Sequence, residues 1–163
     1  MLPSRIRSYT FQGLTGTPAT LVRLLRDVPS DSPRWDVRPD AERFTLREIL
    51  CHLVDFDEIG LLRLGRMVTE ANPQLENWDE TAAVVSNDYA AADPEATLRH
   101  FAAHRETLMK WLDERSPSDW ARTGSHPQLG TFTTEEFVVL LLAHDTYHIR
   151  QMAEWLEHME RAD

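Results

Sequence analysis

The chain has 163 residues, which predicts one domain, residues 1–163, large enough to bury a real core. Its 17 basic and 27 acidic residues give a formal net charge of -10, and no cluster of Lys and Arg offers the positive surface that nucleic acid binding needs. The N-terminus lacks the apolar core of a signal peptide and no apolar run is long enough to span a bilayer, so we expect a cytoplasmic protein without a membrane partner.

The first two predicted helices are recognised by leucines at helical spacing and by the residues that begin them. One covers residues 17–27, with a threonine as its N-cap and a proline at its first position, where a missing N–H costs nothing. The other covers residues 45–71, where Thr45 as N-cap and Glu48 three residues later predict a capping box. An Asn-Pro pair ends it.

Two further helices are predicted over residues 93–115, with Asp93 as the cap, and 133–160, with two glutamates in the first turn. The connections, residues 73–92 and 115–132, are longer than bundle helices usually need, which predicts short helical turns or a cover over one end of a site. No stretch alternates with the period of a strand. The pattern predicts an all-α four-helix bundle with long connections between helices 2 and 3 and between helices 3 and 4.

The last helix contains "LLLAHDTYHIRQMAEWL", in which His144 and His148 lie on the apolar stripe together with Gln151. Side chains four residues apart on a helix differ by only about 40° in direction. Two imidazoles in this position can bind one ion, and bundle cores often hold metal sites built from facing helices. Such a pair alone is weak evidence for a metal site, because buried histidines are more often hydrogen-bonded core residues.

A third ligand must come from another inward stripe, and His52 in the second helix lies on one. His100 and His104 repeat the same spacing but lie at or beyond the edge of their helix stripe, so we expect them to be interfacial or solvated. His126 lies in a loop and His158 in the final turn, and neither is needed. Three buried imidazoles without a common partner would be costly in a core, which favours a metal site.

The motifs "FTLREILCHLVDFD", "HPQLGTFT" and "HDTYHIRQ" resemble those of the DinB-like superfamily of bacterial metal-binding four-helix bundles. The resemblance covers nearly the whole chain and implies that His52, His144 and His148 are the metal ligands. Two positions depart from the family pattern. Arg150 stands where many members have a small residue, and Asp57 where many have Glu.

The same superfamily includes bacillithiol- and mycothiol-dependent S-transferases, maleylpyruvate isomerases and proposed hydrolases. The resemblance implies a divalent ion, zinc or nickel, a small-molecule substrate and a low-molecular-weight thiol as one co-substrate. Three imidazoles with an open position lower the pKa of a bound water or hold a thiolate. Glu48, Asp55 and Gln151 are candidates to orient the nucleophile, although each also has a structural interpretation.

Two alternatives remain open at this point. The ion could be non-catalytic and simply staple helices 2 and 4 together, which a fourth protein ligand would favour. Assembly is the other open matter, because helix 2 carries a second apolar face. That face could pack inside the bundle or form the seam of a homodimer, which the resemblance also implies. Its residues are Leu46, Leu50, Leu53, Leu61 and Leu64.

Overall fold

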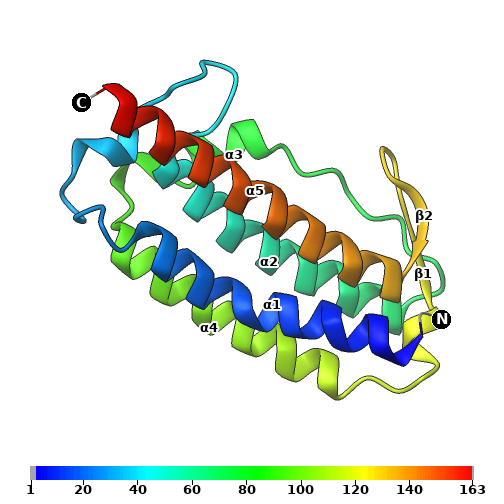
Figure 1. The fold of residues 1–163 in the computed structure, drawn as a ribbon. Coiled ribbons are helices and arrows are strands. Elements are labelled where there is room, and N and C mark those ends of the chain that lie inside the picture. The colour runs from blue at the N-terminus through cyan, green and yellow to red at the C-terminus, as the bar shows by residue number, and fades with distance from the viewer. Residues whose placement is uncertain (1–2, 163) are drawn as a thin grey trace.

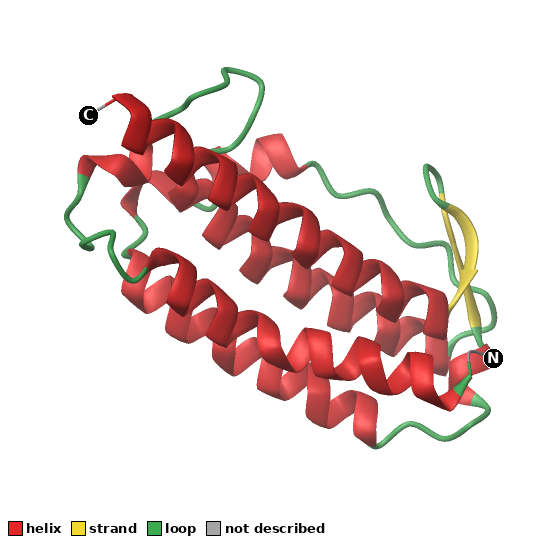
Figure 2. Ribbon diagram, in the orientation of Figure 1, coloured by secondary structure: helices red, strands yellow, loops and turns green. Residues whose placement is uncertain are grey.

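The computed structural model describes residues 3–162 and contains a bundle of four long helices lying side by side (Figure 1). The long helices are α1 (Ser4–Leu25), α2 (Leu46–Thr69), α4 (Pro94–Asp113) and α5 (Thr134–Ala162). The connections add the short helix α3 (Glu80–Ser86) and an antiparallel hairpin of β1 (Thr123–His126) and β2 (Gly130–Thr133). The predicted bundle is confirmed, and the hairpin, drawn yellow in Figure 2, is an addition to it. Within the described range, none of the helices combines the length and apolar character that crossing a bilayer requires.

The order of the helices explains the length of one connection. Around the bundle α1 packs on α4, α4 on α2, α2 on α5, and α5 on α1. Figure 1 shows α2 and α4 running in the same direction and α1 and α5 running in the opposite direction. Because α2 and α4 are parallel neighbours, the chain between them, residues 70–93, must travel back along the whole bundle. We call residues 70–93 the return segment.

The predicted starts of the later helices are confirmed in their hydrogen bonds. The Thr45 hydroxyl accepts the backbone N–H of Glu48 at 3.2 Å, and the Glu48 carboxylate accepts the N–H of Thr45 at 2.8 Å, so the capping box is complete. Asp93 caps α4 from its side chain. Thr133 and Glu136 form the same reciprocal pair at the start of α5. These bonds satisfy N–H groups that the first helical turn leaves without partners.

The predicted start of the first helix is wrong, because α1 begins at Ser4 and carries Pro18 in its interior. A proline inside a helix has no N–H for the carbonyl four residues earlier. Here that carbonyl belongs to Leu14, and the guanidinium of Arg105 donates to it at 3.0 Å. A tertiary hydrogen bond therefore replaces the missing helical one, and Thr17 is an internal residue and not an N-cap.

The core contains two large apolar clusters with a buried polar network between them, and a smaller cluster around Cys51, Ala83 and Tyr89. One large cluster includes Leu21, Trp35, Leu50, Phe101 and Trp155; the other includes Leu14, Leu64, Leu108, Phe137 and Leu141. Each long helix contributes one buried side chain to the network between them, namely Thr17, Asp57, Arg105 and Asp145. The Arg105 guanidinium donates to both oxygens of Asp57 at 2.8 Å, and to Asp145, which also accepts the Thr17 hydroxyl at 2.8 Å.

The second apolar face of α2 is covered inside the single chain. Leu46, Leu50, Leu53 and Leu64 are buried in the bundle, and Leu61 is half-buried. The bundle itself therefore provides the partner that this face requires, and the homodimer stays a prediction without support from these leucines.

Candidate metal centre

The structure brings the three predicted ligands together between α2 and α5. His52 lies in the second turn of α2, while His144 and His148 follow one another by a helical turn in α5. The Nε2 atoms of His52 and His144 are 2.9 Å apart. One ring nitrogen from each histidine lies within 4.8 Å of the other two. The side chains thus converge on one point, as their positions on the inward stripes require.

Burial keeps the three imidazoles uncharged at neutral pH. His52 and His148 are only 1% and 5% exposed, and His144 is half-buried. Burial, together with their mutual repulsion when protonated, lowers the pKa of His52 to about 3 and that of His144 to about 2. Burial also lowers the pKa of His148 to about 4. A neutral imidazole has one nitrogen lone pair available for a metal ion.

The nitrogens that face one another in the cluster suit a cation, whereas two nitrogens on the far side of the rings have no hydrogen-bond partner in the described part of the chain. His148 Nδ1 donates a hydrogen bond to the Gln151 side-chain oxygen at 3.0 Å, so the ring proton is on Nδ1. The Nε2 atom therefore keeps a lone pair that can bind a metal ion. The Nδ1 atoms of His52 and His144 are buried and have no partner among residues 3–162. Buried polar atoms are almost always paired, so this cluster is exceptional. Its donor set, three neutral imidazoles, fits a divalent transition-metal ion.

Aromatic side chains form the walls of the centre. Trp78 from the return segment stacks on His52 with ring centroids 5.3 Å apart and planes at 13°, and Phe56 stacks on His144 at 3.6 Å and 13°. Phe44 packs against His52 from the other side. Tyr147 meets the edge of His148. These contacts hold the rings in place and exclude water from their faces.

A carboxylate that the sequence did not single out lies beside the three histidines. Glu80 begins α3 in the return segment, and its Oε2 is 3.8 Å from His52 Nε2. Its side chain is 58% exposed, so it faces the opening of the centre. Partial burial and the neighbouring Asp79 raise the pKa of Glu80 above its ordinary value, which makes it a stronger base. No local sequence pattern marks Glu80, because only the path of the return segment places it there.

Two cavities open beside Glu80. One of about 250 Å³ is bordered by Glu80, His144 and His148, and the other, of about 320 Å³, by Glu80, Phe56 and Trp78. Only the first cavity is lined by histidines of the centre, and the second adjoins the centre through Glu80 and the two aromatic rings. A larger groove of about 610 Å³ lies between α1 and α4 and contains none of the predicted site residues.

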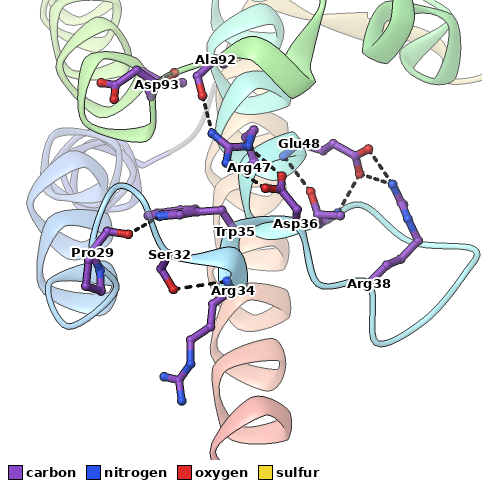
Figure 3. Close-up of polar contacts among 12 residues, drawn as sticks. Pro29, Ser32, Arg34, Trp35, Asp36, Arg38, Arg47, Glu48, Ala92 and Asp93 are labelled. Carbon is purple, nitrogen blue, oxygen red and sulfur yellow. Dashed lines mark hydrogen bonds and ion pairs between the residues drawn. The ribbon is translucent and has the colours of Figure 1, made fainter.

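Glu48 and Asp55, two of the predicted orienting groups, are engaged elsewhere. Glu48 caps α2 and forms an ion pair with Arg38 at 2.6 Å, as Figure 3 shows. Asp55 accepts hydrogen bonds from Tyr89 at 2.6 Å and from Asn87 at 2.7 Å. Their side chains stabilise the helix start and the return segment. Of the three predicted orienting groups, only Gln151 makes a hydrogen bond to one of the histidines.

The second histidine pair, His100 and His104, lies on the outer surface of α4, where the sequence predicts a solvated position. Both side chains are partly exposed, and His104 Nε2 lies 3.1 Å from the carboxylate of Glu58 on α2. These three side chains also bring one ligand atom each within 4.8 Å of the others. The same spacing thus occurs once inside the bundle and once on its surface.

Comparison with known proteins places this geometry among similar bundles. Residues 14–152 match the family described as the DinB superfamily. "Putative metal-dependent hydrolase OB0782" from Oceanobacillus iheyensis is 27% identical over 131 residues, which span 79% of this chain and 76% of that protein. "Putative metal-dependent hydrolase YfiT" from Bacillus subtilis is 27% identical over 155 residues, or 91% of this chain and 83% of that protein. The solved structure of YfiT superposes on this chain with a TM-score of 0.89 at 22% identity. The match covers 98% of this chain and 91% of the YfiT chain, which is described as "a probable metal-dependent hydrolase with an unusual four-helix bundle topology".

Proposed function

The chain belongs to the DinB superfamily, and from that premise we propose that it is a metal-dependent hydrolase whose ion is held by His52, His144 and His148. The observation that carries the proposal is the convergence of three neutral ring nitrogens beside the carboxylate of Glu80, at the meeting point of two cavities. The names of the two bacterial relatives point to the same class of reaction.

A divalent ion bound to three imidazoles with an open position supplies a Lewis acid and lowers the pKa of a water that it holds. Zinc and nickel both accept this donor set, and their supply in the cell decides between them. The protein contributes the rigid frame. The stacked rings of Trp78 and Phe56 fix two of the imidazoles, and Gln151 fixes the third in the tautomer with a free Nε2.

Glu80 is the group best placed to move protons. Its Oε2 can take the proton that an attacking water gives up and return it to the leaving group, so that water adds across the broken bond. Its exposed side chain on a short helix also leaves it free to turn toward either cavity.

A thiol S-transferase is the second candidate, favoured by the aromatic walls around the centre. Phe44, Phe56 and Trp78 suit the carbon skeleton of an organic co-substrate as well as they exclude water. In that reaction a low-molecular-weight thiol gives up its proton to Glu80 and its sulfur replaces the leaving group. A non-catalytic staple requires a fourth protein ligand, and Glu80, at 3.8 Å from His52, is the nearest carboxylate for it.

Metal content tests the ligand assignment. We expect wild-type protein loaded with zinc or nickel and desalted to retain one ion per chain by mass spectrometry, and the His148→Ala variant to retain none. His158→Ala is the matched control, because His158 is an exposed histidine of the same helix and belongs to neither histidine cluster. An unchanged ion content in His148→Ala would overturn the assignment.

Activity separates the three functions once the ion is bound. We expect hydrolysis of a panel of aryl esters and amides by the metal-loaded protein, and a loss of roughly 100-fold to 10,000-fold in kcat for Glu80→Gln with its ion retained. Product formation only after addition of a thiol would instead identify the transferase. Loss of the ion in Glu80→Gln, together with inactivity of the wild type toward both panels, would identify the staple.

A further inference from the structure

The cavity of about 320 Å³ beside Glu80 is also bordered by a buried arginine. Phe56 and Trp78, which stack on the histidines, form part of its wall. Arg63 from α2 and His126 from the hairpin border the same cavity. A molecule lying in this cavity therefore meets these two basic side chains and Glu80, whose carboxylate lies 3.8 Å from His52.

Arg63 is a buried cation without a counter-ion. It is 7% exposed, and its Nη2 donates to the backbone carbonyl of Glu76 at 2.8 Å. No carboxylate lies within 4.0 Å of its guanidinium anywhere in residues 3–162, whereas the other buried arginine, Arg105, is bound to two. Burial lowers the pKa of Arg63, with no acidic neighbour to offset this effect. An arginine nevertheless stays protonated, and a buried charge left alone is costly.

His126 presents a second hydrogen-bond donor to the same point. Its Nδ1 accepts the backbone N–H groups of Gln128 and Leu129 at 3.2 and 3.4 Å, so Nδ1 carries no proton. The proton of the neutral ring is then on Nε2. That Nε2 lies 3.5 Å from Arg63 Nη2. Two N–H donors thus face each other, and neither can accept a hydrogen bond from the other.

An oxyanion is the group that completes this arrangement, because its oxygens accept from both donors and its charge balances the guanidinium. We propose that Arg63 and His126 form a subsite for the carboxylate or phosphate of a small anionic substrate, whose other end reaches the three-histidine centre. This inference rests on the proposed function for the reacting end only. The anion site itself follows from the two donors and the missing counter-ion.

Two carboxylates that border the same cavity limit the substrate further. Asp79 and Glu80 border the cavity beside the metal centre, and the Asp79 side chain caps α3 by accepting the N–H of Ala82 at 2.9 Å. A second anionic group would meet these carboxylates. The substrate class is therefore a small molecule with one anionic end and a neutral scissile group such as an ester or amide.

Binding tests the subsite without requiring any reaction. Zinc-loaded, ¹⁵N-labelled protein is titrated with acetate and, separately, with inorganic phosphate at constant ionic strength set by chloride. We expect saturable shifts of the backbone amide signals of Gln128 and Leu129, and a dissociation constant raised roughly 10-fold to 100-fold in Arg63→Gln. The anion with the lower dissociation constant shows whether the subsite prefers a carboxylate or a phosphate. Arg66→Gln is the matched control, since Arg66 lies one turn further along α2, is only half-buried and is paired with Glu70.

Arg63→Lys keeps the positive charge but loses the planar guanidinium. We therefore expect its affinity for the anion to lie between those of the wild type and Arg63→Gln, and it provides a folded variant if the glutamine variant is unstable. Amide shifts that are absent, or equal in wild type and both Arg63 variants, would overturn the subsite.

A pair of aryl esters that differ only in a terminal carboxylate then links the subsite to the reaction. We expect a higher kcat/KM for the charged ester, and loss of that preference through KM in Arg63→Gln but not in Arg66→Gln. Failure to hydrolyse either ester would contradict the proposed function while the anion titration still stands. An unchanged preference in Arg63→Gln would contradict the subsite alone.

Discussion

Two buried polar clusters lie at the same level of the bundle and differ in how completely they are paired. In one cluster Arg105 donates hydrogen bonds to the carboxylates of Asp57 and Asp145, and the Thr17 hydroxyl donates to Asp145. The histidine cluster leaves the Nδ1 atoms of two of its rings without partners in the described chain. His144 and Asp145 are consecutive residues, so one helical step separates the two clusters.

The difference shows how a bundle core can hold two kinds of polar group. In the Arg105 cluster burial alone would lower the pKa of the guanidinium, but hydrogen bonds to Asp145 and Asp57 raise it above its ordinary value. The charges are therefore held by one another, and the cluster ties all four helices together. Burial lowers the pKa values of the histidines with little compensation, so their lone pairs remain available. The Arg105 cluster serves the fold, and in the proposed function the histidine cluster serves a metal ion.

Removing the central arginine should produce the largest effect. Arg105→Ala leaves Asp57 and Asp145 buried without a cation and the Leu14 carbonyl without its donor, so we expect the free energy of unfolding to fall by about 3–5 kcal/mol. Urea denaturation followed by circular dichroism measures it. Arg99→Ala, on the exposed face of the same helix, should cost less than about 0.5 kcal/mol. Similar losses for both variants would refute a structural role specific to the Arg105 cluster.

Removing the hydrogen bond between His148 and Gln151 should act on metal binding and much less on folding. In Gln151→Leu the His148 Nδ1–H loses its acceptor, and we expect the metal dissociation constant to rise roughly 10-fold to 100-fold, which is about 1.4–2.7 kcal/mol. Competition with a coloured chelator measures the constant. Gln12→Leu, at an exposed position of α1, is the control. An unchanged affinity in Gln151→Leu would mean that this side chain does not orient the ligand.

Lowering the pH should reduce the stability of the metal-free protein gradually, through the histidine cluster, and by less than the Arg105 substitution does. The pKa of His148 falls from an ordinary 6.5 to about 4 in the folded chain, so below pH 6.5 the unfolded chain takes up a proton that the folded chain does not. Its contribution to stability is complete above pH 6.5 and is lost as the pH falls toward 4. For metal-free protein we expect unfolding free energy to fall more steeply in wild type than in His148→Ala, by at most about 1.4 kcal/mol per pH unit. Denaturation series at pH 7, 6, 5 and 4 provide both slopes, and equal slopes would contradict the lowered pKa.

The sequence predicts what depends on helical periodicity. Caps such as Thr45 and Asp93 mark helix starts because their side chains bond to nearby N–H groups in the same segment. His52, His144 and His148 could be grouped because each lies on the inward stripe of a helix with recognisable limits. In each case the decisive information is contained within a few residues of one helix.

Features that depend on distant segments could not be predicted in this way. The extension of α1 through Pro18 is stabilised by Arg105, which is 91 residues away from Leu14 in the chain. The hairpin strands have four residues each, too short for an alternating pattern to identify them. Glu80 reaches the histidines only because two parallel helices force the return segment across the bundle.

That crossing has a consequence for how such a bundle can change during evolution. The histidines lie on α2 and α5, whose packing holds the core, whereas Trp78 and Glu80 come from the return segment and His126 from the hairpin. Substitutions in surface connections usually cost little stability, while those in packed helices cost more. The lining of the cavities can therefore change through the connections while the helices keep the three histidines, so that one ancestral bundle can give rise to descendants that bind different small molecules.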